Sequence, residues 1–422
     1  MIVFYQVQLT WPPHLPMKFI FELSDTETKL HAVFDRDDNM RGTREEGPKT
    51  AITFTSTPIT FDYVIKKHMH PDLAGLLCLI IFYPFIGKRV EFAEPVSPRL
   101  VEAFKNRCFD RQFEFVNVDS SIPKYEGTKP VLAFGGGVDS SAVRSFFPEA
   151  FVVHEAHVKD GKLLPSDSHD VVNSLGMNKA CVVVSNQRYV STPGGWHGWS
   201  CSAATALLMA TDYDFGLIMT GSVLGSTLLN NGKRYYDRFK ARRWHGVTGN
   251  YWQSCFEAVG LPMFSPVCGA SELITMKSSL PLIRQNQVVY CMSRDGHACG
   301  LCTKCFRREI IRAVVDEEYT ANFDSYNRPA IHAFLETRPI YFGHIFSYAK
   351  EKVDLPSWID QRISDIQTIK TDWPMAYDYR VMDFLIQPKW KAYVNGRLRK
   401  FLRPMTSAET NEMTTWGAES TA

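Results

Sequence analysis

A glycine-rich stretch at residues 129–141, Lys-Pro-Val-Leu-Ala-Phe-Gly-Gly-Gly-Val-Asp-Ser-Ser, constrains the fold of this chain more than any other segment. Its apolar start predicts a buried strand, the three glycines predict a loop that can take positive φ, and the polar end predicts the first turn of a helix. Backbone N–H groups and the helix dipole at such a junction attract an anion. The stretch therefore predicts a phosphate-binding loop, with an ordinary helix cap at Asp139 or Ser140 as the alternative.

The polar residues of this glycine loop carry the expected chemistry. Ser140 and Ser141 can donate hydroxyl hydrogen bonds to phosphate, and Asp139 could hold a magnesium ion. No Gly-Lys-Ser/Thr follows the glycines, so the loop is not of the Walker type. The order strand, Gly-Gly, any residue, Asp-Ser resembles the pyrophosphatase loop of the N-type ATP pyrophosphatases, where a serine usually stands at the position of Gly135. The resemblance implies that the loop binds ATP.

The composition is that of a folded protein without a membrane span. The 422 residues are 45% hydrophobic and 13% aromatic, which is enough for two or three domains with real cores. The net charge of +2 argues against extended nucleic-acid binding, although the basic segment 233–243 could form a local patch. The N-terminus lacks the features of a signal peptide, and the apolar run 73–86 is shorter than the ~20 residues that span a bilayer. We therefore expect a cytoplasmic protein with no membrane partner.

Residues 130–264 alternate between apolar strands and helical segments. Apolar strands separated by helices predict a parallel sheet covered on both faces, and ligands of such sheets bind at the carboxyl ends of the strands. That geometry places His154, Thr220 and Gly221 beside the glycine loop in one crevice. The predicted fold is α/β, in four parts. These are 1–128, a β-rich module with helices; 129–310, the sheet domain with the cysteine cluster; 311–405, a helical region; and 406–422, a disordered tail.

Four of the ten cysteines lie close together in the pattern Cys-x7-Cys-x2-Cys-x2-Cys. They are Cys291, Cys299, Cys302 and Cys305. Two-residue gaps let a tight turn aim neighbouring sulfurs at one point, and structural zinc prefers four tetrahedral thiolate ligands. We expect a structural zinc ion here; an iron–sulfur cluster, redox-active thiols, or His297 in place of one cysteine are the alternatives. The clustering also indicates a reducing compartment.

The glycine loop followed by this cysteine cluster resembles the 7-cyano-7-deazaguanine synthase (QueC) family over residues 130–308. The resemblance implies an adenine nucleotide alpha hydrolase-like fold of the PP-loop type. Enzymes of that family adenylate the carboxylate of 7-carboxy-7-deazaguanine with ATP and Mg2+, release pyrophosphate, and convert the acyl group with ammonia into an amide and then a nitrile. The residues expected at the nucleotide site are Phe134, Gly135, Gly136, Gly137, Asp139, Ser140, Ser141, His154, Thr220 and Gly221, with Asp139 and Ser140 in catalysis and the four cysteines on Zn2+.

The sequence departs from the family where the small substrate should bind. Residues 155–159 read Glu-Ala-His-Val-Lys instead of a Tyr-Gly-Gln-Arg-type segment, and residues 193–198 lack the Arg and Asn that usually follow Pro-Gly. The lysine that usually comes soon after Ser-Pro is also absent, with Lys277 the next candidate. Candidate contacts to pyrophosphate or carboxylate are Lys159, Arg188, Lys233 and Arg234, and candidate ring-stacking residues are Trp196, Trp199, Tyr235 and Trp244. Surface charges and core aromatics are the alternative interpretations.

The modules before and after the resembling core indicate an acceptor larger than ammonia. The chain looks most like QueC-like enzymes of bacterial antiphage systems, including some CBASS operons, which join a deazaguanine acid to a protein amine. We expect an ATP-dependent ligase with a deazaguanine-type acid as substrate and a protein acceptor as partner, and the resemblance leaves room for a homodimer. An ammonia-using nitrile synthase, a tRNA thiolation enzyme and a non-catalytic ATP-binding scaffold are the other hypotheses.

Overall fold

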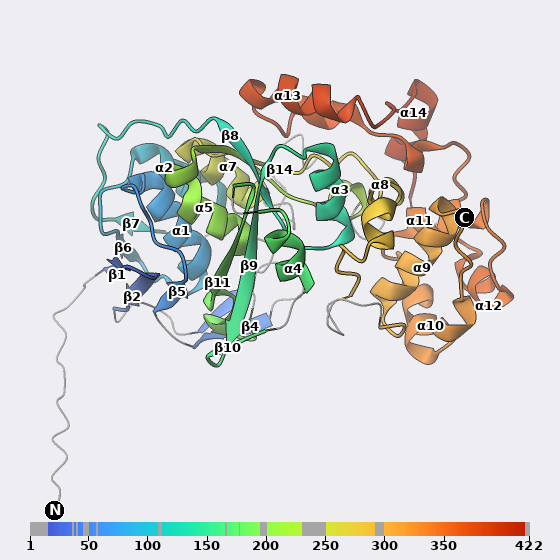
Figure 1. Ribbon diagram of the computed structural model, residues 1–422, viewed down its shortest axis with the longest axis horizontal. Helices are drawn as coiled ribbons and strands as arrows, with labels where there is room; N and C mark the ends of the chain where they lie inside the picture. The colour runs from blue at the N-terminus through green and yellow to red at the C-terminus, as the bar shows by residue number, and fades with distance from the viewer. Residues whose placement is uncertain are drawn as a thin grey trace, which may run out of the picture.

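An 11-stranded sheet runs through the molecule and positions its other elements (Figure 1). The computed structural model describes residues 16–35, 38, 41–44, 50–55, 58–108, 112–164, 167–176, 178–194, 201–229, 250–291 and 299–417. The strands lie in the order β14-β13-β8-β9-β11-β5-β2-β1-β6-β7, and β10 (Lys162–Leu163) pairs with β9.

The centre of this sheet is parallel, as predicted. Its strands are β14 (Met263–Phe264), β13 (Phe215–Met219), β8 (Lys129–Ala133), β9 (Phe151–Lys159) and β11 (Ala180–Ser185), and each neighbouring pair runs in the same direction. All five residues of β13 are buried, which fits a strand covered on both faces.

Helices cover both faces of the parallel strands. Leu132 and Val152 pack into a core with α3 (Val138–Phe146) and α4 (Asp167–Asn173). Their neighbours Val131 and Val153 pack into a second core with α1 (Pro71–Phe82), α2 (Pro98–Cys108), α5 (Cys201–Tyr213) and α7 (Asn250–Val259). Successive residues of a strand point to opposite faces, so each strand serves both cores.

The N-terminal strands extend the same sheet. Ser185 at the end of β11 pairs with Phe61 of β5 (Ile59–Phe61), and the sheet continues through β2 (Thr28–Val33), β1 (Met17–Leu23), β6 (Arg89–Glu91) and β7 (Glu114–Phe115). A separate three-stranded sheet contains β3 (Arg41–Arg44), β4 (Thr50–Phe54) and β12 (Ser191–Thr192). The sheet and its second core therefore continue across the division predicted at residue 128.

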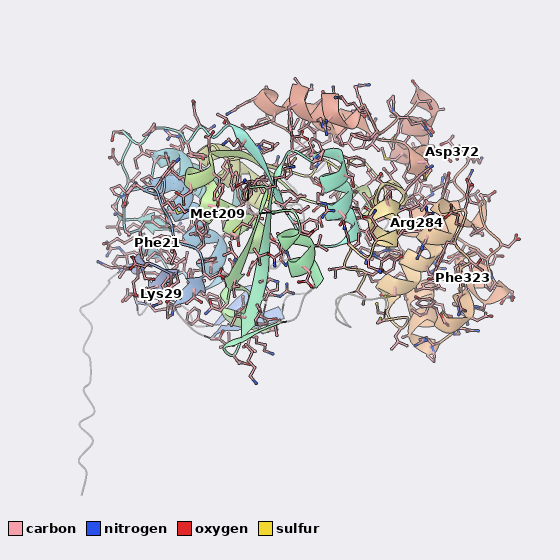
Figure 2. The ribbon with its side chains drawn as sticks, viewed as in Figure 1. Phe21, Lys29, Met209, Arg284, Phe323 and Asp372 are labelled. Atoms are coloured by element: carbon pink, nitrogen blue, oxygen red, sulfur yellow. The ribbon has the colours of Figure 1, made fainter. Side chains whose placement is uncertain are left out.

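Helices dominate the C-terminal part, which lies at the end of the molecule opposite to the N-terminal strands. In Figure 2, Phe21 and Lys29 mark the end with the N-terminal strands, and Arg284, Phe323 and Asp372 mark the helical end. They are α8 (Glu272–Arg284), α9 (Thr303–Val315), α10 (Pro329–Glu336), α11 (Gly343–Lys350), α12 (Ser357–Asp360), α13 (Pro388–Leu398) and α14 (Ser407–Thr415). Short 3-10 helices are η1 (Tyr83–Phe85), η2 (Gln187–Tyr189), η3 (Leu224–Ser226), η5 (Phe323–Tyr326), η6 (Gln361–Ile363), η7 (Trp373–Met375) and η8 (Tyr379–Asp383). The helices from α8 to α14 share the first core with α3 and α4.

The prediction of a disordered tail from residue 406 is wrong over 406–417. Thr406 and Glu409 form a reciprocal capping box at the start of α14. Met413 and Trp416 are each 1% exposed. The end of the chain is therefore held by core packing that outweighs its polar composition. Among the helices that the structure describes, none has the length and apolar character needed to cross a membrane.

Candidate functional site

The glycine loop connects β8 to α3 in the predicted order. The backbone N–H of Phe134 still pairs with the Val153 carbonyl at 2.8 Å, after which the chain leaves the sheet. Gly136 has a φ of +75°, a conformation that glycine adopts without strain. Gly137 is the N-cap residue of α3, and its carbonyl accepts a hydrogen bond of 2.9 Å from the Ser141 N–H. Among the described residues no side chain caps this helix end, so the first N–H groups of α3 keep their capacity to bind an anion.

The ends of β8 and β13 and the middle of β9 meet at this loop. A Cβ atom on Gly221, just after β13, would lie 2.7 Å from the Ser140 nitrogen, so the two segments are in contact. His154 of β9 lies on the other side, where its Nδ1 is 2.7 Å from the Phe134 carbonyl and donates to it. Thr220 pairs through its backbone N–H with Phe264. The structure thus brings the predicted loop residues together with His154, Thr220 and Gly221.

The position between β8 and β13 is the topological switch point of the sheet. The chain leaves β8 through α3 on one face, and it enters β13 from α5 on the other. Open α/β sheets bind ligands outside the carboxyl ends of strands at such a point. The loop therefore occupies the place where this architecture offers a crevice.

Asp139 is held by α8, a helix that the sequence did not predict. The Thr275 hydroxyl donates a hydrogen bond of 2.6 Å to Asp139 Oδ1. Glu272 lies one turn earlier on α8 and is 4% exposed. Burial, followed by the nearby Glu272 carboxylate, raises the pKa of Asp139 above its ordinary value. Two close carboxylates of this kind are suited to a cation, and Mg2+ prefers oxygen ligands.

Two arginines of α9 supply positive charge on the same side of the loop. Arg308 is 5% exposed, donates to the Tyr290 carbonyl, and has Nη2 3.9 Å from the point where a Gly137 side chain would begin. Arg307 lies over the Phe342 ring at 3.7 Å, and its burial lowers its pKa. Both positive charges oppose the rise in the Asp139 pKa.

Glu272 also belongs to a buried acid–histidine pair. His344 of α11 has Nε2 3.2 Å from Glu272 Oε2, and neither side chain is more than 5% exposed. Among the described residues, Glu272 Oε1 has no hydrogen-bond partner. The helical C-terminal part thus contributes directly to the surroundings of the glycine loop.

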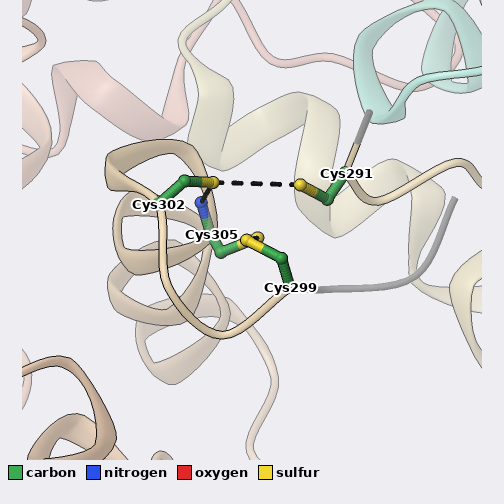
Figure 3. A group of neighbouring side chains, drawn as sticks. All are labelled: Cys291, Cys299, Cys302 and Cys305. Carbon is green, nitrogen blue, oxygen red and sulfur yellow. Dashed lines mark hydrogen bonds between the residues drawn. The ribbon is translucent and has the colours of Figure 1, made fainter. Parts of the chain in front are cut away.

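The four predicted cysteines form one cluster (Figure 3). Their sulfur atoms all lie within 4.8 Å of one another, with 3.8 Å between Cys291 and Cys302 and 3.6 Å between Cys299 and Cys305. A tetrahedral zinc ion with bonds of about 2.3 Å sets its sulfurs about 3.8 Å apart. The donor set and spacing therefore fit zinc, and the cluster could bind this metal.

Backbone N–H groups support the same sulfurs. Leu301 donates to Cys299 Sγ and Cys305 donates to Cys302 Sγ, both at 3.4 Å. Gly300, with a φ of +64°, makes the tight turn between them. Such hydrogen bonds stabilise thiolates, which are the metal-binding form. His297 lies outside the described residues.

Other predicted contact residues are only partly placed. Lys159 lies 5.8 Å from the centre of the Tyr189 ring, and Arg188 contacts His157, both at the carboxyl end of β9. Lys277 is exposed on α8. The remaining candidates, Trp196, Trp199, Lys233, Arg234, Tyr235 and Trp244, lie outside the described residues.

The C-terminal part of the chain matches a known family. Residues 251–417 match DUF6395, a family of unknown function. The matched region contains α8, α9, α11 and the cysteine cluster, whereas the glycine loop precedes it. Neither a curated protein nor a solved structure matches the chain.

Proposed function

We propose that this protein is a QueC-like, PP-loop ligase that forms a C–N bond at the expense of ATP. In this proposal it adenylates the carboxylate of 7-carboxy-7-deazaguanine, releases pyrophosphate and transfers the acyl group to an amine. The proposed acceptor is a protein amine in antiphage defence, in the cytoplasm. ATP and Mg2+ bind at the glycine loop, and Zn2+ binds at the cysteine cluster.

One observation carries the proposal: the glycine loop lies at the switch point, against the end of β13, with an open helix N-terminus behind it. A phosphate group there would meet N–H groups of α3 and positive charge from Arg308. Asp139 and Glu272 would meet the magnesium ion that accompanies ATP. In this arrangement, N–H groups, a positive charge and a metal ion could together stabilise pyrophosphate as it leaves.

The protein residues act by positioning and by charge. The substrate carboxylate oxygen attacks the α-phosphorus, and the bond to the pyrophosphate oxygen breaks while Arg308 and the loop N–H groups stabilise the departing charge. The amine nitrogen then attacks the acyl carbon, AMP leaves, and the amine gives up a proton. None of these steps needs a nucleophilic side chain.

The cysteine geometry favours this ligase over a tRNA thiolation enzyme. Thiolation needs sulfurs that react, and the four clustered sulfurs are spaced as zinc ligands. A closed four-thiolate site has no open position for catalysis. The proposed metal is therefore structural.

Pyrophosphate release tests the proposal. Purified protein receives ATP, Mg2+ and 7-carboxy-7-deazaguanine, with ammonia or a co-expressed neighbouring protein as acceptor, and mass spectrometry follows every product. We expect acid-dependent pyrophosphate release and a mass increase on the protein acceptor. A small-molecule nitrile as the sole product would instead establish the ammonia-using synthase.

Two variants make this experiment specific. Asp139→Asn should abolish pyrophosphate release, whereas Asp160→Asn, in the exposed turn after β9, should leave it unchanged. Asp160 has a φ of +51°, which asparagine also adopts readily, so this control is matched in chemistry and fold. Absence of acid-dependent release from the unaltered protein would refute the ligase and favour the scaffold.

A further inference from the structure

A second polar cluster lies at the carboxyl end of β9, one strand away from the glycine loop. Glu155 and His157 are on β9, and Arg188 is on η2. Glu155 Oε1 is 3.1 Å from His157 Nδ1, and His157 Nε2 is 3.3 Å from Arg188 Nη1. These residues take no part in the nucleotide site proposed above.

The hydrogen-bond order in this cluster follows from the arginine. A guanidinium group only donates, so His157 Nε2 must accept from Arg188. The remaining proton of a neutral imidazole is then on Nδ1, which donates to Glu155. In this order of donors Glu155 is the acceptor, and Arg188 supports its carboxylate through His157.

Glu155 is buried but incompletely paired. Its residue exposure is 1%, and Oε2 has no hydrogen-bond partner among the described residues. An unpaired buried carboxylate oxygen is less favourable than an unpaired neutral group, because it has also lost the hydration of its charge. Because buried polar groups in native proteins are nearly always hydrogen-bonded, we expect Oε2 to bind a partner that the described residues do not supply. That partner must be a hydrogen-bond donor.

The location indicates a ligand. Glu155 follows Val153 by two residues on the same face of β9, beyond the Phe134–Val153 pair at which the glycine loop leaves the sheet. Ser185 lies opposite His157 in the β9–β11 register. The cluster thus occupies the strand-end edge where α/β sheets bind ligands, beside the proposed phosphate site.

We infer that Glu155 binds a flat heterocycle through two adjacent N–H donors, as on the N1–H and 2-amino edge of a guanine-like ring. Glu155 Oε2 has no hydrogen-bond partner among the described residues, and Oε1 can accept a second hydrogen bond beside that from His157. The carboxylate can therefore accept from both donors. The inference rests on the proposed function for the identity of the ring, and it names the residue that selects this substrate class. Arg188 and His157 position Glu155.

Direct binding tests the inference separately from catalysis. Isothermal titration compares 7-carboxy-7-deazaguanine with its analogue lacking the 2-amino group, and binding of a non-hydrolysable ATP analogue is measured on the same samples. We expect the analogue to bind at least about tenfold more weakly, because it leaves the carboxylate unpaired. Glu155→Gln should lose this discrimination and at least about tenfold in affinity for the acid. Glu102→Gln, exposed on α2, is the control and should behave as the unaltered protein.

Thermal unfolding distinguishes ligand binding from a merely structural role. A residue that holds the fold through His157 would destabilise the protein when changed, whereas removal of an unpaired buried charge should leave the Tm of Glu155→Gln unchanged or raised. Equal binding of the two acids, unchanged acid binding by Glu155→Gln, or a lowered Tm would each overturn the inference. Acid binding by the unaltered protein that Glu155→Gln leaves unchanged would overturn this inference alone; absence of acid binding by the unaltered protein would overturn the proposed function as well.

Discussion

The backbone N–H of Val289 donates a hydrogen bond of 2.8 Å to the carbonyl of Gly136, the middle glycine of the loop. The next residue, Tyr290, accepts a hydrogen bond from Arg308 through its carbonyl and has its ring 5.0 Å from the guanidinium carbon, and Cys291 of the cysteine cluster follows. Three consecutive residues therefore connect the glycine loop, Arg308 and the cysteine cluster. Because a loop carbonyl depends on this contact, occupancy of the cluster should stabilise the loop.

Removal of the metal should weaken nucleotide binding. Chelation, or Cys291→Ser, frees residues 289–291 and with them the contacts to Gly136 and Arg308, so we expect ATP affinity to fall about tenfold. Titration of a non-hydrolysable ATP analogue before and after chelation measures this, and metal analysis reports the zinc content. Cys181→Ser is the control, since Cys181 lies on β11 apart from the cluster. Unchanged ATP affinity of the metal-free protein would show that the connection carries no coupling.

Thiol alkylation should divide the cysteines into two classes. Burial raises the pKa of Cys181 to about 11 and also raises the pKa of Cys78 and Cys268. At pH 8 only about one Cys181 in a thousand is thiolate, so these three should react slowly with iodoacetamide in the folded protein and faster as the pH rises. Peptide mass spectrometry should find the four cluster cysteines protected in the metal-bound protein and labelled after chelation. Equal labelling with and without metal would argue against a metal at the cluster.

Asp139→Asn should stabilise the protein without Mg2+. The folded state raises the pKa of Asp139 above 3.8, so it favours the protonated form. The ionised carboxylate therefore costs stability above the raised pKa, and this cost disappears as the pH falls toward 3.8. We expect the variant to melt about 1–3 °C higher than the unaltered protein at pH 7, with a difference that shrinks on acidification. Mg2+ should raise the Tm of the unaltered protein but not of the variant; a lower Tm of Asp139→Asn at neutral pH would contradict this account.

Local signals predicted much of the fold. The helices expected in the N-terminal module have clear local signals, since α1 and α2 each combine an initial proline with apolar residues on the buried side. The parallel strands were visible as short apolar runs. The helix α8 was missed because it contains Pro281 and mixes polar with apolar residues. Thr406 and Glu409 have the spacing of a capping box, which is a sequence signal for the start of α14. The polar composition of residues 406–422 instead led to the prediction of a disordered tail.

The candidate site was only half visible in the sequence. The glycine loop and the cysteine cluster each lie within a short stretch of sequence. In the structure, the residues of the loop lie next to one another, and so do the four cysteines. Thr275 lies 136 residues from Asp139, and its hydrogen bond arises from the packing of α8 on α3. The unpaired oxygen of Glu155 likewise depends on burial by several elements. Pairings of this kind come from tertiary contacts, which local patterns do not encode.

Two glycines near the loop should respond differently to a methyl group. A Cβ on Gly221 would lie 2.7 Å from the Ser140 nitrogen and 2.9 Å from the Asp139 carbonyl carbon, both backbone atoms that cannot rotate away. Gly221→Ala should therefore push β13 and α3 apart at the start of the helix. We expect a loss of roughly 1–3 kcal/mol in the free energy of unfolding, measured by urea denaturation.

Gly135 is the matched control, because a Cβ there meets no atom within 4 Å in the part of the chain that the structure describes. Gly135→Ala should keep the stability of the unaltered protein, and Gly135→Ser should do so while restoring the hydroxyl that ATP pyrophosphatase loops usually carry. If the loop binds phosphate, Gly135→Ser should bind the ATP analogue at least as tightly as the unaltered protein, whereas Gly221→Ala should bind it about tenfold more weakly, because its loop N–H groups are displaced. Equal stability and equal ATP binding of Gly221→Ala and Gly135→Ala would mean that the contact between Gly221 and the start of α3 does not shape the loop.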